Sequence, residues 1–449
     1  MKEPIRYLSL CGLLGYGYSP VSLENALKEK LDFVGVDAGS TDPGPYYLGS
    51  GKGFVKKLQV KRDLALILPH IKERNIPLVI GSAGGSGAKP HVESVLEIIG
   101  EIAREQGREF KVAVIYSDLD ADFMRKAADG HLFSCGGSPD FKTELVDKLV
   151  NPVAQFGTGP IIEALESGAE IIVSGRCCDT AVFASYPIWK GFDPGLALHA
   201  AKIAECGALC ARPVGANDSL VVEMYEDHFT VEPPNPARTC TPDSVAAHSL
   251  YEQPDPNCFY EPEGKIDLSG SSFEQIAPRK VLVRGSKLII ADKETTKLEG
   301  TVRIGCRSIS IAGMRDPSGV AHLDEIEKGV RAAVAESASF VKPDEYSLRF
   351  LRYGLDAVTG DNEAPDIMPR EVGLVIEAIA PTQEQADALV ALARSKALHQ
   401  GFPDRKATAG NLAFPFSPSD FSGGEVYEFA LYHLTDLPLE FEVKTMVIK

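Results

Sequence analysis

The chain has few cysteines and no long apolar run. Nine cysteines among 449 residues are too few for a disulfide scaffold, and an odd number cannot all pair. We therefore expect reduced thiols and a cytoplasmic protein. The N-terminal apolar stretch breaks at Gly and Pro before it could act as a signal peptide. No run approaches the roughly 20 apolar residues that a membrane span needs.

Basic residues are scarce relative to acidic ones. Lys and Arg number 46 against 63 Asp and Glu, which gives a net charge of −17. A chain this acidic repels phosphate backbones and anionic lipids, so we expect neither nucleic-acid nor membrane-surface binding. Hydrophobic residues make up 44% of the chain, and its length is enough for two or three domains that each bury a core.

Short apolar runs alternate with helical patterns through the first half of the chain. The runs are continuously apolar, which is typical of parallel strands buried on both faces. We therefore predict an α/β ligand-binding domain at residues 1–215 with a doubly wound, mostly parallel sheet. The expected strands are 7–11, 33–37, 78–81, 112–116 and 171–174, and the expected helices are 21–31, 61–74, 91–106, 121–130, 159–168 and 194–211.

The rest of the chain divides into two further segments. Frequent turn-forming Pro, Asn and Asp residues predict a β-rich connector over 216–300, in which 281–284 and 287–291 form a hairpin. Residues 301–449 show the order β-α-β-β-α-β, which predicts a C-terminal ferredoxin-like α+β domain. Its expected elements are strands 302–312, 346–353, 372–380 and 427–434 and helices 322–339 and 382–399, the second of them capped by Thr382.

Polar segments follow each of the five strands expected in the first domain. Ligands bind at the carboxyl ends of the strands in an open α/β sheet, so we expect these segments to converge on one site. The first segment, from Gly12 to Gly17, is glycine-rich, and Asp37 lies about 20 residues further on, where a dinucleotide-binding fold places a ribose-binding acid. The glycine spacing differs from the dinucleotide fingerprint. A tight turn is therefore the simpler interpretation, and a nicotinamide cofactor is the alternative.

The second segment carries Asp37, Ser40, Thr41 and Asp42. Its Asp-Ala-Gly-Ser-Thr string is similar to the phosphate loop of actin-like proteins and sugar kinases. The two prolines that follow forbid the strand pairing that such a loop needs, which argues against a kinase. We expect these four side chains to contact a small ligand, and a structural turn held by side-chain to backbone bonds is the alternative.

The third segment is a glycine-rich loop that opens a helix near Pro90. Backbone N–H groups at a helix N-terminus bind anions, so this loop is expected to hold a carboxylate or oxyanion. It lacks the Lys-Ser/Thr ending of a nucleotide-binding loop. His91 lies in the first helical turn, where the helix dipole disfavours its charged form, so it is either an acid/base or a surface residue. The expected substrate-binding residues here are Ser82, Gly84, Gly85, Ser86 and Gly87.

The fourth and fifth segments carry acids and one arginine. Asp118 is the first of three acids on alternate positions, and the run lacks the glycine and glutamate of a calcium loop. We expect the other two acids to stabilise the next helix and Asp118 to take a proton. Arg176 and Asp179 could orient a carboxylate and move a proton, or simply pair with each other. The expected catalytic residues are Asp118, Arg176, Asp179 and His91.

No metal site and no cofactor are expected. His199 and Cys206 share a helical face, but seven residues separate them, about 10 Å along a helix. Two thiols nearby do not complete a zinc site. Coenzyme A enters only as part of a substrate. In the last segment Asn411, Ser417 and Ser419 belong to a polar and aromatic loop that serves either substrate binding or a subunit contact.

Four strings in the chain resemble the acyclic terpene utilisation (AtuA-type) family. They are DAGSTDPGPYYLGSG from Asp37, GSAGGSG from Gly81, GRCCDTA from Gly175 and GNLAFPFSPSD from Gly410, and they are spread over most of the chain. The resemblance implies a catabolic setting, the breakdown of branched terpenoid acids and their coenzyme A esters. It implies no catalytic residue.

These expectations favour a cytosolic catabolic enzyme that acts on a small carboxylate or an acyl-CoA thioester. Its chemistry would be proton transfer of the hydratase or lyase type, and a homo-oligomer is expected. One alternative is a non-catalytic binding or scaffold subunit that acts with a partner protein through exposed sheet edges of its ferredoxin-like domain. A less favoured alternative is a nicotinamide-dependent oxidoreductase.

Overall fold

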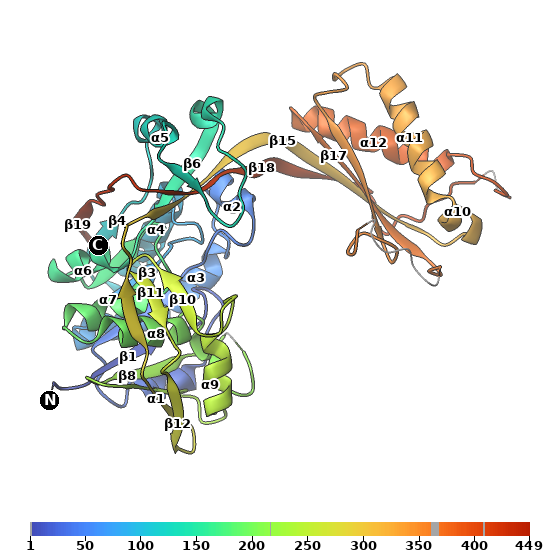
Figure 1. Ribbon diagram of the computed structural model, residues 1–449. Coiled ribbons are helices and arrows are strands. Elements are labelled where there is room, and N and C mark those ends of the chain that lie inside the picture. Colours follow the sequence, from blue (N-terminus) through green and yellow to red (C-terminus); the bar gives the residue numbers. More distant parts are fainter. Residues whose placement is uncertain (1, 216, 361–367, 407–408) are drawn as a thin grey trace. The chain divides into compact units, whose positions relative to one another are not determined.

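The computed structural model describes residues 2–215, 217–360, 368–406 and 409–449 (Figure 1). It divides into two compact units: unit 1 comprises residues 1–302 and 429–449, and unit 2 comprises residues 303–428. The chain passes from one unit to the other within β15 (Thr296–Met314) and returns within β18 (Asp420–Thr435). This grouping differs from the three expected segments, because the residues of the expected connector belong to unit 1 and the end of the chain returns to unit 1.

Unit 1 is built on a ten-stranded sheet with a parallel centre. The strand order is β12-β13-β9-β8-β1-β2-β3-β7-β4-β19, and β1, β2, β3, β7 and β4 are parallel neighbours. A mixed α/β fold with a parallel-rich sheet is thus confirmed. The parallel strands are β1 (Ile5–Ser9), β2 (Phe33–Asp37), β3 (Leu78–Gly81), β7 (Ile171–Ser174) and β4 (Phe110–Ile115). The flanking strands are β8 (Leu220–Met224), β9 (Phe229–Glu232), β12 (Ser272–Ala277), β13 (Lys280–Arg284) and β19 (Val443–Ile448).

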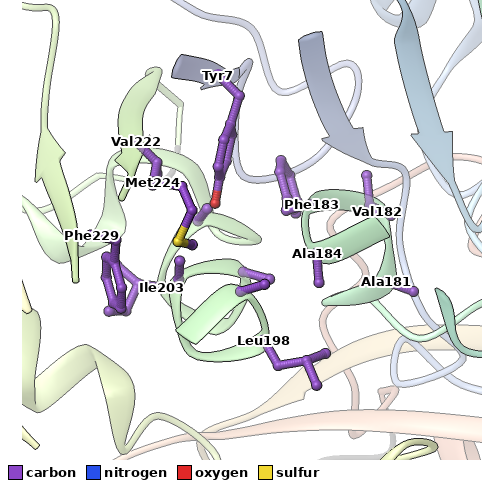
Figure 2. Close-up of a cluster of buried hydrophobic side chains, with 14 of the residues drawn as sticks. Tyr7, Ala181, Val182, Phe183, Ala184, Leu198, Ile203, Val222, Met224 and Phe229 are labelled. Atoms are coloured by element: carbon purple, nitrogen blue, oxygen red, sulfur yellow. The ribbon is translucent and has the colours of Figure 1, made fainter. Parts of the chain in front are cut away.

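The parallel strands are buried on both faces. Tyr7 and Phe33 enter one core, whereas the next residues, Leu8 and Val34, enter a second core. Figure 2 shows part of the first core, where Tyr7 and Phe183 lie among apolar side chains of neighbouring elements. Helices α6 (Thr158–Glu166), α7 (Ala181–Trp189) and α8 (Pro194–Ala204) pack into the first core, and α1 (Pro20–Ala26), α3 (Lys57–Arg74) and α4 (Lys89–Gln106) pack into the second. Burial of both faces explains why these strands are continuously apolar in sequence.

The hairpin expected at 281–284 and 287–291 is wrong. Strand β13 pairs with β12 and β9 in the large sheet, whereas β14 (Lys287–Ile290) pairs with β11 (Gly264–Asp267) in a separate sheet that β10 (Cys258–Glu261) completes. Gly285, between the two strands, has a φ of 96°. Glycine adopts this conformation without steric cost, and here it sends the chain from one sheet into another.

Several elements of unit 1 carried no clear pattern in the sequence. Helix α7 is buried nearly throughout, so it lacks the polar face that marks an amphipathic helix. Helix α2 (Pro45–Ser50) starts at a proline, which is favourable at the first helical position because no N–H is needed there. The remaining unpredicted elements of unit 1 are α9 (Pro242–Ser249), β5 (Leu132–Ser134), β6 (Leu149–Gln155) and the 3₁₀ turns Thr143–Lys148 and Gly207–Cys210, whereas α5 (Ala121–Ala128) lies within the helix expected at 121–130.

Unit 2 follows the predicted element order. After β15 come α10 (Pro317–Ala321), α11 (Leu323–Ser337), β16 (Ser347–Tyr353), β17 (Val372–Ala380), α12 (Gln383–His399) and β18. Strand β17 lies between β16 and β15 and is antiparallel to both. The predicted cap is confirmed, because the Thr382 hydroxyl accepts from the Gln385 backbone N–H in a capping box. Among the described residues, no helix is both long and apolar enough to cross a membrane.

Candidate functional site

The segments that follow the parallel strands touch one another at one edge of the sheet. The Leu14 backbone N–H donates to the Asp37 carbonyl (2.8 Å), which joins the segments after β1 and β2. The Arg176 backbone N–H donates to the Ser117 hydroxyl (2.7 Å), and its Nη1 donates to the Ser82 hydroxyl (3.2 Å). These bonds join the segments after β3, β4 and β7. The Ala38 N–H, just after β2, donates to the Gly81 carbonyl at the end of β3 (3.0 Å) and links the two groups, so the contacts expected between these segments are present.

The glycine-rich loop after β3 is packed against its neighbours. A Cβ atom on Gly87 would lie 2.2 Å from the Arg176 backbone nitrogen, so only glycine fits there. The N–H groups of Gly85 and Gly87 donate to the carbonyls of Ser82 and Ala83 (3.0 and 3.1 Å). These two amides are used within the loop and are not free to hold an anion. The Ser86 hydroxyl, by contrast, is buried without a hydrogen-bond partner among the described residues.

Arg176 is 3% exposed and contacts two acids. Its Nε donates to Glu299 Oε2 (2.8 Å), and its Nη1 lies 3.4 Å from Asp179 Oδ1. The Arg176–Asp179 pair that the sequence left as an alternative is therefore present, with Glu299 as the closer partner. Glu299 is fully buried on β15 and also accepts from Lys297 Nζ (2.8 Å) and the Thr41 hydroxyl (3.0 Å). Burial alone would raise the pKa of Glu299, but Arg176 and Lys297 hold that pKa at about 2, so this carboxylate is ionised.

We call Arg176, Glu299 and Lys297 the ion cluster. Three carboxyls near it have raised pKa values. Burial raises the pKa of Asp37 well above its usual range, and the nearby Asp179 adds to the rise. Burial also raises the pKa of Asp179, although Arg176 and Lys202 oppose the shift. The pKa of Glu205 rises to about 8, again mainly because of burial. We call Asp37, Asp179 and Glu205 the carboxyl cluster. A raised pKa brings a carboxyl closer to the range in which it can give and take protons at physiological pH.

The members of the carboxyl cluster differ in their contacts. Asp37 Oδ2 accepts from the Gly39 N–H (3.0 Å), whereas its Oδ1 is buried and has no hydrogen-bond partner among the described residues. Glu205 Oε1 accepts from Lys202 Nζ (2.6 Å). Asp37 and Glu205 are each 6% exposed, but the Asp179 side chain is 34% exposed. Asp179 is therefore the member that a ligand can reach most readily.

Helix α8 brings Lys202 and Glu205 to this edge. The Ser9 hydroxyl, at the end of β1, donates to the carbonyl of Ala204, the last residue of α8 (2.6 Å). Neither charged residue was predicted, because α8 has the composition of a core helix. A signal was present, since a lysine and a glutamate three positions apart lie in an otherwise apolar run.

Glu261, at the end of β10, adds a further acid near the cluster. Its Oε2 accepts from the Thr180 hydroxyl and from the Cys178 thiol, both at 2.7 Å. Burial raises the pKa of Glu261 to about 7. Glu261 and Glu299 were also not predicted, because Glu261 lies 83 residues after Cys178 and Glu299 lies 123 residues after Arg176. No spacing rule in a single sequence connects such positions.

Asp118 and His91 make contacts that support α4. Asp118 Oδ1 accepts from the Lys89 N–H (2.9 Å) in the first turn of this helix. His91 is buried, and its Nε2 lies 3.1 Å from the Tyr47 carbonyl and 3.2 Å from the Lys52 carbonyl. Burial lowers the pKa of His91, so the ring is neutral and donates from Nε2. A catalytic role for these two residues stays a prediction.

The remaining predicted ligands lie in two places. Thr41 reaches the ion cluster through Glu299, and the Ser40 hydroxyl donates to Asp42 Oδ2 (2.7 Å) on the same segment. Asn411 belongs to unit 2, where its amide donates to carbonyls at the end of α12. Ser419 also belongs to unit 2 and donates to Asp420 Oδ1 (3.1 Å). Ser417 precedes a cis peptide bond to a proline in the same unit.

All nine cysteines are free. His199 is buried in the core, with its Nε2 at 3.0 Å from the Ser249 hydroxyl. Within the described ranges, no three His, Cys, Asp or Glu side chains are arranged to hold a metal ion.

Comparison with known proteins gave one match. A family model described as acyclic terpene utilisation family protein AtuA matches residues 48–413 of the 449-residue chain. The matched region includes the glycine-rich loop, the carboxyl-cluster residues Asp179 and Glu205, and most of unit 2. No curated protein and no solved structure matches the chain.

Proposed function

The chain belongs to the acyclic terpene utilisation (AtuA) family, and from this premise we propose that it is a catabolic enzyme that moves a proton on a small carboxylate or an acyl-CoA thioester. The observation that carries the proposal is the carboxyl cluster, in which Asp37, Asp179 and Glu205 all have raised pKa values. A raised pKa makes a carboxylate a better proton acceptor, which suits proton transfer to and from a substrate. The proposed reaction is of the hydratase or lyase type.

Asp179 is the proposed proton acceptor. It is the most exposed member of the cluster, and it follows β7 at the edge where α/β sheets bind ligands. A proton taken from the carbon next to a carbonyl leaves negative charge on the carbonyl oxygen. Asp118 is less suited to this role, because its carboxylate is bonded to the first turn of α4.

Arg176 is proposed to act mainly through its charge. Its Nε and Nη1 groups are already engaged by Glu299, Asp179 and the Ser82 hydroxyl. A fixed positive charge beside the reacting carbonyl still stabilises the negative charge that develops there. The Ser86 hydroxyl is the proposed hydrogen-bond donor from the glycine-rich loop, since it is buried without a partner among the described residues. Coenzyme A would enter as part of a thioester substrate, and no further cofactor is proposed.

Deuterium exchange tests this function. The purified full chain would be incubated in D₂O with saturated and unsaturated carboxylates and their coenzyme A esters, and mass spectrometry would follow deuterium uptake and addition of water. We expect exchange with the wild type and a loss of about 100-fold or more in Asp179→Asn, the size of a general acid–base contribution. Asp122→Asn, an exposed acid on α5, is the matched control.

Two outcomes would overturn parts of the proposal. Exchange at wild-type rate in Asp179→Asn would remove the role of this residue. Absence of exchange and of turnover with every acid and thioester would overturn the proposed function as a whole. Activity that appears only after mixing with a second protein would instead favour a subunit that acts with a partner.

A further inference from the structure

Unit 2 contains a cavity of about 250 Å³ that has no part in the proposed function. One wall is formed by residues 313–316, which end β15 and lead into α10, and the other by the segment after α12. Backbone bonds join the two walls, because the Gly313 N–H donates to the Ala413 carbonyl (2.8 Å) and the Ala413 N–H donates to the Gly313 carbonyl (2.9 Å). The string GNLAFPFSPSD, whose role the sequence left open, supplies part of the second wall.

The second wall is held against α12. The Asn411 N–H donates to the Leu398 carbonyl (2.7 Å). The Asn411 side-chain amide donates to the carbonyls of Ala397 and Gln400 (3.1 and 2.8 Å). A Cβ atom on Gly410 would lie 2.3 Å from Leu398 Cδ1, so the segment passes directly over this helix. This side of the cavity is therefore set by fixed backbone.

Three cations line the cavity, namely Arg315, Arg405 and Lys406. Arg315 and Lys406 are exposed, and none of the three forms an ion pair with a described residue. The Arg405 guanidinium donates from Nη1 to the His399 carbonyl (3.0 Å) and from Nη2 to the Ala409 carbonyl (2.8 Å). These neutral carbonyls hold the guanidinium in place and leave its positive charge without a counter-charge.

Asp316 is the one acid in the described lining. Its Oδ1 accepts from the Gly319 N–H (3.0 Å) as the cap of α10, so the carboxylate is bonded to the helix backbone. The lining thus carries three positive charges and one negative charge, in a chain whose net charge is −17. Charges of one sign around a hollow attract ions of the opposite sign, so this cavity favours an anion.

The size and charge of the cavity limit its ligand. About 250 Å³ is below the roughly 300–1,000 Å³ of pockets that hold drug-sized ligands, so the ligand is small. The excess of two positive charges matches a phosphate group, which carries about −1.5 to −2 at neutral pH, better than it matches a carboxylate with its single charge. Arginine also suits phosphate oxygens, because its N–H groups donate in a planar fork.

We propose that this cavity is a binding site for a dianionic phosphate group, carried by inorganic phosphate or by a small phosphomonoester. Arg315 and Lys406 supply the contacts, one from each wall, and Arg405 adds a third positive charge. The site belongs to unit 2 and the carboxyl cluster to unit 1, so this inference does not depend on the proposed function.

Calorimetric titration of the full chain tests the ligand class. The probes are inorganic phosphate, methyl phosphate and acetate, each at neutral pH and low ionic strength. We expect both phosphates to bind and acetate to bind about 10-fold more weakly or worse, because acetate lacks the second charge. Tighter binding of methyl phosphate would identify a phosphomonoester as the ligand, and tighter binding of inorganic phosphate would identify the free anion. Equal binding of acetate would overturn the assigned ligand charge, and no binding of either phosphate would overturn the proposal.

Removal of either exposed cation tests the location of the site. Arg315→Met and Lys406→Met should each weaken phosphate binding about 10-fold, since each removes a charge-assisted contact. Lys328→Met on α11 is the matched control, because Lys328 is also exposed, does not line the cavity and forms no ion pair with a described residue. Circular dichroism checks that the variants are folded. Unchanged affinity in both cavity variants would overturn the site.

Asp316→Asn tests the charge of the cavity in the opposite direction. Asparagine caps a helix about as well as aspartate, so α10 should stay intact while the negative charge of the described lining is removed. Phosphate binding should tighten about 2- to 5-fold, the size of an interaction between exposed charges. Unchanged or weaker binding in this variant would show that the charge of the cavity does not attract the ligand, and it would overturn the proposal.

Discussion

Arg176 and Glu299 lie 123 residues apart in the chain, yet Arg176 Nε and Glu299 Oε2 are 2.8 Å apart. Both side chains are almost completely buried. The contact links the segment after β7 to β15 and fixes the guanidinium beside Asp179. Lys297 and Thr41 complete the surroundings of Glu299. This arrangement ties the stability of unit 1 to the geometry of its candidate site.

Replacing Glu299 with glutamine should destabilise the protein strongly. The Arg176 charge would remain buried without its closest partner, and breaking a buried pair costs about 3–5 kcal/mol. Urea unfolding followed by circular dichroism measures the change. Glu274→Gln is the control, because Glu274 forms an exposed pair with Arg284 whose loss should cost about 0–1 kcal/mol. A cost below 1 kcal/mol for Glu299→Gln would show that the buried pair does not hold this region together.

The same carboxylate predicts a specific loss of stability in acid. The pKa of Glu299 is lowered from 4.5 to about 2 in the folded state. Stability from this group is therefore complete above pH 4.5 and is lost as the pH falls from 4.5 toward 2, a total of about 3 kcal/mol. The difference in unfolding free energy between the wild type and Glu299→Gln should shrink over that pH window. A difference that stays constant from pH 6 to pH 3 would contradict the assigned pKa.

The pH dependence of the proposed reaction should reflect Asp179. A base must be deprotonated to accept a proton, and the pKa of Asp179 is raised, chiefly by burial. The kcat/KM value should therefore rise with pH through a midpoint above the usual range of aspartate and then level off. The measurement is the exchange rate of the best substrate over the range in which the protein stays folded. A midpoint at or below the usual aspartate pKa would assign the proton transfer to another group.

The parts of the fold that could be predicted are those that depend on residues close together in the sequence. The parallel strands were recognisable because residues such as Leu8 and Val34 follow the apolar residues of the opposite face without a polar position between them. Thr382 was recognisable because a capping residue acts on the turn beside it. These signals depend only on neighbours within a few residues.

The parts that could not be predicted depend on partners far away in sequence. Glu299 looks like an ordinary strand residue until the fold places Arg176 beside it, and Lys202 looks like an incidental charge on a core helix. The hairpin failed for the same reason, since the partner of β14 is β11 rather than its neighbour β13. The convergence at the carboxyl ends of the strands was predictable because topology, not side-chain chemistry, determines it.

Gly87 offers a test of how tightly the glycine-rich loop is packed against Arg176. Its φ is 68°, and a Cβ atom would lie 2.2 Å from the Arg176 backbone nitrogen, so Gly87→Ala must displace the segment after β7. Gly136→Ala is the matched control, because its φ is 60° and no atom lies within 4 Å of its Cβ position. The control should cost about 1 kcal/mol of unfolding free energy for its backbone conformation alone. Gly87→Ala should cost clearly more and should also lower the deuterium-exchange rate, because the displaced segment carries Asp179. If the two variants lose the same unfolding free energy and both keep full activity, the glycine-rich loop accommodates the added methyl group without moving Arg176.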